Sequence, residues 1–551
     1  TDYPAPSYPN FVEINSIDDI MPYAREAARN ENAFLGHGLG IANPGEKVIL
    51  ITSTRNFAYD ESRDLFLEAI VKALEERGVE ATLWHDYEIL GVSFDQVIEY
   101  RDYVNSVLGP VNSRGWDNGC GHFTVNDFLE TSRPDLYELC NPPDLEARMP
   151  AHLVDVHRRL SQPGGTSQQN PVIIYVNKHM AENPDIKGVF YGTGGAIWEN
   201  IEPKEKWLGL FRFDNQWEIM TSAREFPADV WMLSEEITME PLGASDKATI
   251  TDPEGTDVWW TLTEDQAQRW ERGVYLRGHL FMFPQEAYGG YGLNVLNYPA
   301  NVPEYIPAAP IVLLNGTIAA HASSSGYYSR MVQVWEDGYL KEVHGDGNYP
   351  ELLRTLMKMP GIHDHTWPQY DKPGYFYHYE TALGTNPKVV RPDVRNLIIA
   401  PERERDGIMH WAFGAQIWHD EGSMKIPAPS LTEFEKKYKL PARYHTFHQH
   451  TFFNTMQVRI RGTDKWVTLV DKGRRPALDS PEVRALASRY GDPDQILSTD
   501  WIPKIPGINA PGNYEAYAQD PYTYEVEEMD RIGTGRYDTY NPYLPERQAP
   551  N

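Results

Sequence analysis

The chain has 551 residues, which is enough for two to four domains and a large buried core. Its hydrophobic fraction of 41% and charged fraction of 23% are ordinary for a globular protein. A net charge of −29 argues against a nucleic acid or an anionic membrane as partner. No stretch reaches the roughly 18 apolar residues of a membrane span, and no signal peptide is evident. Cys120 and Cys140 are expected to be reduced thiols of a cytoplasmic protein.

Residues 1–245 are predicted to form an α/β domain. The β-branched run KVILITS from Lys47 indicates a buried strand, residues 60–77 have the spacing of an amphipathic helix ended by Gly78, and VEATLWH follows as a second strand. Such a unit implies a parallel sheet with a right-handed crossover. The runs PVIIYVN (171–177) and KGVFYGTG (187–194) are expected to be further strands.

Residues 246–475 are predicted to form a mainly antiparallel α+β domain that binds metal. Two strands are expected around the turn in ATITDPEGTDVWWTLT, and MVQVWEDGYLKEVHG should be a hairpin turning at Asp337-Gly338. Further strands are expected at IMHWAFG and TMQVRIRGTDKWVTLVDKG, with a helix at YPELLRTLMKM between them and the hairpin. Residues 476–551 should hold one capped helix and then an extended Tyr/Pro-rich arm, either wrapped on a neighbouring subunit or disordered.

The strongest metal-ligand pattern is His448-Gln449-His450. On a strand, His448 and His450 point to the same face, about 6–7 Å apart at Cα, a common way to present two imidazoles to one ion. A second H-x-H pattern, residues 363–365, lies in a Pro/Gly-flanked loop and is a weaker candidate. Neither a G-x-S-x-G elbow nor an H-E-x-x-H helix motif occurs.

Several further segments occur along the chain in an order that is typical of one protein family. They are NPGEKVILIT (43–52), TDPEGTD (251–257), Glu304 followed by NGT (315–317), Glu380 followed by GTNP (384–387), GIMHWAFG (407–414) and HQH (448–450). In this order they resemble the metalloaminopeptidases of family M29 (aminopeptidase T and S type) and their relatives, the 2,5-dihydroxypyridine 5,6-dioxygenases. The resemblance spans roughly residues 35–475 and implies that family's fold.

The resemblance also implies a ligand set. The family's two-metal peptidases have ligands at the positions of Glu304, Glu380 and His410 and at an H-x-D motif. The last carboxylate of H-x-D is His450 here, so a second metal is less well held. The dioxygenase relatives hold one Fe(II) at positions that correspond to Glu380, His448 and His450. One carboxylate and two imidazoles are the composition of the facial triad of non-haem iron oxygenases.

The favoured function is therefore a mononuclear non-haem Fe(II) dioxygenase that cleaves a hydroxylated aromatic or N-heteroaromatic ring with O₂. His410 or Glu304 is the candidate base for the substrate hydroxyl, and the aromatic segment 281–298 would suit a flat ring. The alternative is an M29-type aminopeptidase or other hydrolase with Zn, Co or Mn, and a lapsed, non-catalytic member stays open. A homodimer or larger assembly is expected.

Overall fold

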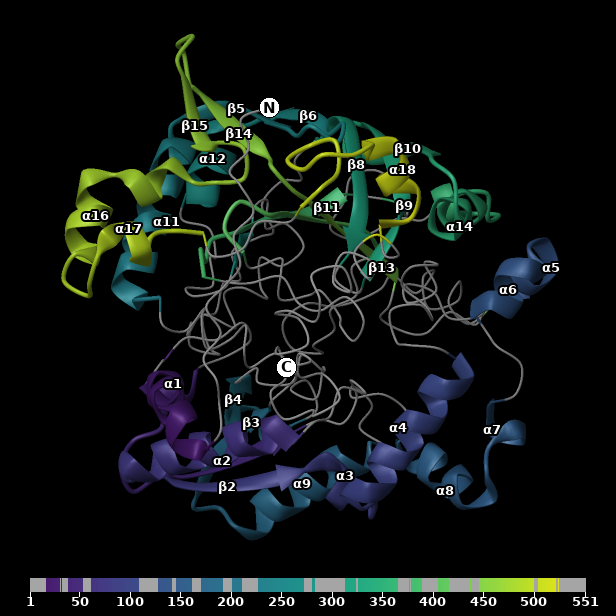
Figure 1. Cartoon of the computed structure of the whole chain (residues 1–551), viewed down its shortest axis with the longest axis vertical. Coiled ribbons are helices and arrows are strands. Elements are labelled where there is room, and N and C mark those ends of the chain that lie inside the picture. Colours follow the sequence, from purple (N-terminus) through teal and green to yellow (C-terminus); the bar gives the residue numbers. More distant parts are fainter. Residues whose placement is uncertain are drawn as a thin grey trace.

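The computed structural model describes two β-sheets with their helices. It describes residues 16–29, 31, 38–52, 61–108, 127–140, 145–160, 170–191, 201–210, 226–271, 280–282, 313–323, 326–364, 376, 378–388, 405–415, 437, 445–499, 504–521 and 524. The parallel sheet lies at the bottom of the view in Figure 1, and the antiparallel sheet lies at the top. The described chain is thus a mixed α/β and α+β architecture, as the sequence predicts.

The first sheet is parallel and has the strand order β2-β1-β3-β4. Its strands are β1 (Lys47–Thr52), β2 (Glu80–His85), β3 (Ile186–Tyr191) and β4 (Trp207–Leu210). The predicted β-α-β unit is confirmed, because α2 (Glu61–Glu76) connects β1 to its parallel neighbour β2. A buried cluster that includes Val48, Leu50 and Ile70 joins these strands to α2 and to α1 (Ile17–Arg29).

The predicted strand at 171–177 is wrong, because this run forms the first part of α9 (Pro171–Glu182). Its apolar, β-branched composition suggests a strand, but the residues before it start a helix. The side chain of Asn170 accepts a hydrogen bond from the backbone N–H of Val172 at 2.9 Å, and Pro171 occupies the first helical position. Val172, Ile173, Val176 and Met180 then form a buried stripe at helical spacing.

The remaining helices of the N-terminal half are mostly short. They are η1 (Leu39–Ile41), α3 (Asp86–Ile89), α4 (Phe94–Leu108), α5 (Asp127–Ser132), α6 (Pro134–Cys140), α7 (Leu145–Arg148), α8 (Ala151–Leu160) and η5 (Lys204–Lys206). Among the helices of the described ranges, none combines the length and apolar character that a bilayer crossing needs. The end of the predicted strand at 187–194, from Gly192 onward, lies outside the described residues.

The second sheet is antiparallel, with eleven strands among the described residues. Its main path is β15-β14-β5-β6-β8-β13-β12-β11-β7, and β9 extends it sideways by pairing with β8 and β10. The strands are β5 (Ser245–Thr251), β6 (Asp257–Thr261), β7 (Leu280–Met282), β8 (Asn315–Ser323), β9 (Gly326–Glu336), β10 (Tyr339–His344), β11 (His378–Gly384), β12 (Met409–Ala415), β13 (His445–Thr451), β14 (Thr455–Ile460) and β15 (Trp466–Val470).

Turn chemistry fixes two of these pairings as the sequence predicts. Asp337 and Gly338 join β9 to β10 with positive φ values of 50° and 79°, the type I′ geometry that matches the twist of a hairpin. The turn in TDPEGTD joins β5 to β6, because Asp252 Oδ1 accepts the backbone N–H groups of Glu254, Gly255 and Thr256 at 2.8–3.1 Å. The expected helix after β10 is α14 (Asn348–Leu356), which is followed by η6 (Ile362–Asp364).

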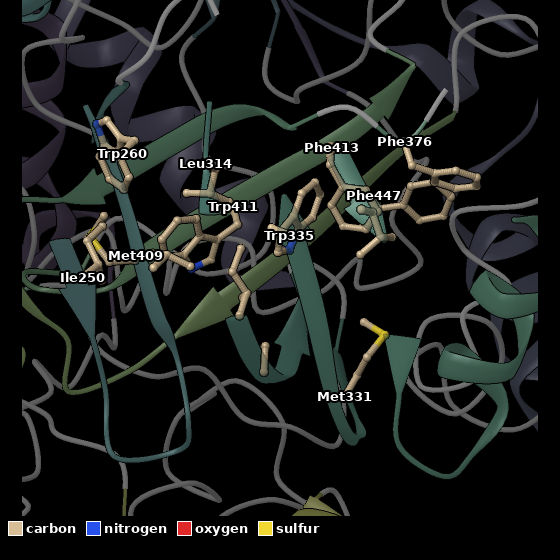
Figure 2. Close-up of a cluster of buried hydrophobic side chains, with 14 of the residues drawn as sticks. Ile250, Trp260, Leu314, Met331, Trp335, Phe376, Met409, Trp411, Phe413 and Phe447 are labelled. Carbon is tan, nitrogen blue, oxygen red and sulfur yellow. The ribbon is translucent and has the colours of Figure 1, made fainter. Parts of the chain in front are cut away.

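One face of this sheet carries the main hydrophobic core (Figure 2). Along β12 the large apolar residues Met409, Trp411 and Phe413 alternate with His410 and Ala412, and the former three belong to the core cluster. Because successive side chains of a strand point to opposite faces, His410 lies on the face away from this core. The alternation of β12 thus places the large apolar side chains on one face and His410 with the small Ala412 on the other.

The described part of the C-terminal region holds more helices than the one predicted. It forms η8 (Pro476–Asp479), α16 (Pro481–Ala487), α17 (Pro493–Ile496) and α18 (Tyr514–Gln519). The expected capped helix is α16, where the Ser480 side chain caps Val483. It packs with α11 (Ala228–Gly243), which is followed by α12 (Glu264–Glu271). Residues 504–521 dock on this chain's own β9 through α18 rather than leaving it as an arm. Residues 525–551 lie outside the described residues.

Candidate functional site

Three neighbouring strands place the predicted ligands in two adjacent rows. In the first row, Ala382 of β11, His410 of β12 and His450 of β13 face one another. In the second row, Glu380 and His448 stand on either side of Ala412. Glu380, His410, His448 and His450 therefore share one face of the sheet, opposite the core. Register alone brings together residues that are up to 70 positions apart in the sequence.

The three histidines form a compact imidazole cluster, the name used below for His410, His448 and His450. The ring centroid of His410 lies 4.9 Å from that of His448 and 5.1 Å from that of His450. His450 Nε2 and His410 Nδ1 are 3.0 Å apart, so one ring donates an N–H hydrogen bond to the other. His410 and His450 are buried, whereas His448 is half-buried. The cluster therefore joins the predicted base, His410, directly to a predicted ligand.

The opposite face of the same strands holds the cluster in register. The indole N–H of Trp411 donates to Thr451 Oγ1 at 3.0 Å, and Thr451 Oγ1 donates to Asn454 Oδ1 at 2.7 Å. Asn454 Nδ2 in turn donates to the Gly407 carbonyl at 3.1 Å. These bonds link the start of β12 to the end of β13. A one-residue slip would break them and turn the imidazoles into the core.

The turn that leads into β12 explains the glycine of the GIMH motif. Gly407 has a φ of 81°, and a Cβ atom there would lie 1.8 Å from the carbonyl oxygen of Gly473. Beside it, Asp406 is fully buried and forms an ion pair with the equally buried Arg475, whose Nε lies 2.5 Å from Asp406 Oδ1. The close approach of two backbones thus fixes the direction in which His410 enters the sheet.

Another buried histidine begins β11. His378 Nε2 lies 2.8 Å from Thr381 Oγ1, and the rings of Trp335 and Trp411 flank the imidazole at centroid distances of 5.7 and 5.9 Å. Burial lowers the pKa of His378 to about 3, so this ring is neutral. It belongs to the packing around the site and not to the imidazole cluster.

For several predicted site residues, the structure describes no side chain at the imidazole cluster. Glu304 and the aromatic segment 283–298 lie outside the described residues, and for Glu380 the structure describes the backbone position alone. His363, of the weaker H-x-H pattern, is exposed and bonds the Met357 carbonyl through Nε2 at 2.8 Å. Among the described side chains, no group of three or more His, Cys, Asp or Glu residues could hold a metal ion.

A second polar cluster was not predicted. Glu254 of the TDPEGTD turn bonds His321 of β8, with Glu254 Oε2 and His321 Nδ1 2.9 Å apart and both side chains fully buried. His321 Nε2 lies 3.3 Å from the hydroxyl of Tyr517 in α18. Asp252 adjoins Glu254, and burial together with the Glu254 charge raises the pKa of Asp252 to about 7.

The sequence offered a weak signal for this second cluster. Two carboxylates in a short turn usually lie at a surface. Here they are buried because β8 and α18, which are distant in the sequence, cover that turn. The ring of His321 lies 5.6 Å from that of Phe452, which follows His450 by two residues. The second cluster therefore lies next to the strand end that carries the imidazole cluster.

Comparisons with known proteins give a sparse result. No protein-family model matches the chain, and no curated protein matches its sequence. A solved structure of 2,5-dihydroxypyridine dioxygenase from Pseudomonas putida KT2440 is similar over 84% of this chain and 98% of that chain. The identity is 10% and the TM-score is 0.41. A likeness at this level establishes neither a family nor an activity.

Proposed function

We propose that the chain is a metal-dependent enzyme, specifically a mononuclear non-haem Fe(II) dioxygenase that opens a hydroxylated aromatic or N-heteroaromatic ring. The observation that carries the proposal is the imidazole cluster. Two buried rings and one half-buried ring converge on one sheet face, at a sequence motif where the resemblance places metal ligands.

The donor set fits such an ion in its chemistry. Glu380, His448 and His450 supply one carboxylate and two imidazoles from neighbouring rows, the composition that non-haem Fe(II) sites use. A ligating imidazole uses its other ring nitrogen for a hydrogen bond that fixes its orientation, and the His410–His450 bond can serve this purpose. Bound there, ferrous iron would supply open coordination sites at which the ring substrate and O₂ meet.

The protein's own residues would then handle the substrate proton. With His450 as a ligand through Nδ1, its Nε2–H group donates to Nδ1 of His410, and His410 then carries its own proton on Nε2. That Nε2–H group would hold the oxygen of the ionised substrate hydroxyl by a hydrogen bond, and Glu304 is then the candidate base that takes the hydroxyl proton.

The experiment combines metal content with oxygen use. Purified protein should carry about one iron per chain and consume one O₂ per ring opened when hydroxylated pyridines and catechols are supplied. His448→Ala and His450→Ala should lose both iron and turnover, whereas His363→Ala, which removes an exposed histidine, should keep them. Two zinc, cobalt or manganese ions per chain, with peptide hydrolysis that needs no oxygen, would instead establish the M29-type hydrolase. Iron bound as tightly by both cluster variants would refute the site.

A further inference from the structure

The second cluster links three separate parts of the chain through one imidazole. Glu254 lies in the turn between β5 and β6, His321 lies on β8, and Tyr517 lies on α18, near the C-terminus. A carboxylate accepts hydrogen bonds only, so the N–H group at Nδ1 of His321 donates the hydrogen bond to Glu254. Nε2 is then the acceptor for the Tyr517 hydroxyl. The order Tyr517→His321→Glu254 is thereby fixed.

This chain of hydrogen bonds fastens α18 to the sheet. Figure 1 shows α18, in yellow, beside β8 and β9. Within α18, Tyr517 and Ala518 are buried, and the neighbouring Glu515, Ala516 and Gln519 are exposed. One further bond ties the helix down, from Ser329 Oγ of β9 to the Gln519 carbonyl at 2.9 Å. A six-residue helix has little stability of its own, so its place on the sheet depends on these buried side chains and hydrogen bonds.

Buried polar groups of α18 and of the turn between β5 and β6 favour release of the helix. Glu254 Oε1, Asp252 Oδ2 and the Tyr514 hydroxyl are buried and make no hydrogen bond to any group that the structure describes. A buried polar atom without a partner is less stable than the same atom in water. Burial raises the pKa of both Tyr514 and Asp252, because the ionised form of each side chain is poorly solvated there. Lifting α18 would admit water to these atoms and offset the contacts that are lost.

The docked helix also borders the imidazole cluster. Tyr517 packs edge-on against His321 at a centroid distance of 5.3 Å, and His321 lies beside Phe452. His450 pairs with Ala322, the residue after His321. The position of α18 therefore decides whether this end of the imidazole-bearing face is covered.

We propose that residues 504–521 form a strap that opens and closes over the β8 end of the sheet, fastened by the Tyr517–His321–Glu254 hydrogen bonds. Opening uncovers the side of the imidazole cluster next to Phe452, so the strap controls access to the candidate site. The motion stands independently of the proposed function, whereas its effect on turnover rests on that function.

The motion is tested by hydrogen–deuterium exchange on the full-length chain. Tyr517→Phe keeps the ring and removes the fastening hydroxyl, so exchange should rise about threefold to tenfold in residues 504–521 and in β8. The matched control is Tyr490→Phe, which removes a hydroxyl bonded to Asp229 Oδ2 in the first turn of α11. Equal exchange in wild type and Tyr517→Phe, or an increase spread evenly over both sheets, would overturn the strap.

Access is tested by locking the strap shut. Ser329→Cys with Gln519→Cys, in a background with Cys120 and Cys140 replaced by Ser, places two thiols where Ser329 Oγ meets the backbone carbonyl of Gln519, and loss of free thiol on oxidation verifies that the disulfide has formed. Oxidation should suppress exchange in 504–521 and cut ring opening at least fivefold, and a thiol reductant should restore both. Suppressed exchange with unchanged turnover would refute the control of access. Absence of turnover in the reduced wild type would count against the proposed function, while the exchange result still decides the strap.

Discussion

The buried ion pair of Arg475 and Asp406 offers the sharpest test of what holds the candidate site in place. Both side chains are fully buried, and the guanidinium also donates to Ser234 Oγ at 3.1 Å, Thr238 Oγ1 at 3.2 Å and the Thr385 carbonyl at 2.5 Å. These partners belong to α11, to the GTNP turn after β11 and to the turn before β12. One cation therefore joins the elements that frame the two rows of predicted ligands.

Removing that cation should be costly. Arg475→Met keeps most of the stem volume but leaves the Asp406 carboxylate buried without its counter-charge, which costs about 3–5 kcal/mol. Asp406→Leu leaves the Arg475 guanidinium buried without its counter-charge, at a similar cost. The double variant removes both charges, so its loss should fall below the sum of the single losses by at least about 2 kcal/mol.

The assay is urea unfolding followed by tryptophan fluorescence and circular dichroism, with each transition fitted separately because the chain has two sheets. Arg474→Met is the matched control. Its guanidinium pairs with the half-exposed Asp479 at 2.8 Å and donates to the Leu497 carbonyl at 3.0 Å, so the variant should lose up to about 2 kcal/mol. A loss below 1 kcal/mol in Arg475→Met, or strictly additive losses in the double variant, would refute the reasoning.

Three further predictions follow from single positions. Gly407→Ala should lower the unfolding midpoint strongly, since its Cβ would lie 1.8 Å from the Gly473 carbonyl oxygen; a midpoint unchanged in urea would contradict the close approach. The pKa of Asp252 is raised to about 7 on folding, so its contribution is fully present below about pH 4 and is lost as the pH rises towards 7. Between about pH 4 and pH 7, Asp252 should lower the free energy of unfolding of the wild type by up to about 4 kcal/mol, and Asp252→Asn should remove this fall. Parallel pH profiles of the two proteins would argue against a buried neutral acid. His450→Asp should lose most ring opening if the centre holds one iron, but preserve or raise hydrolysis if it holds two metals, which steady-state rates in air and under anoxia distinguish.

Local pattern was sufficient for much of the secondary structure. The β-α-β unit at 47–85 and the hairpin turn at Asp337-Gly338 both depend on residues that are close together in the sequence. The exception at 171–177 is instructive. Strand-like composition there lost to the helix-starting pair Asn170 and Pro171, a signal that is equally local but was outweighed by the apolar run.

The sequence by itself therefore determined the division into a parallel and an antiparallel part, and the alternation that puts His448 and His450 on one face of a strand. It also supplies the glycine that the turn before β12 requires. Tertiary structure alone decided that His410 bonds His450, forty residues away, and that Arg475 reaches Ser234 across 241 residues. It alone decided that Tyr517 reaches His321 across 196 residues. Strand alternation and turn geometry are set by neighbouring backbone sterics, which the local sequence states directly. Strand pairing and helix docking are chosen by the burial and hydrogen bonding of the whole sheet, a global balance that no short stretch of sequence contains.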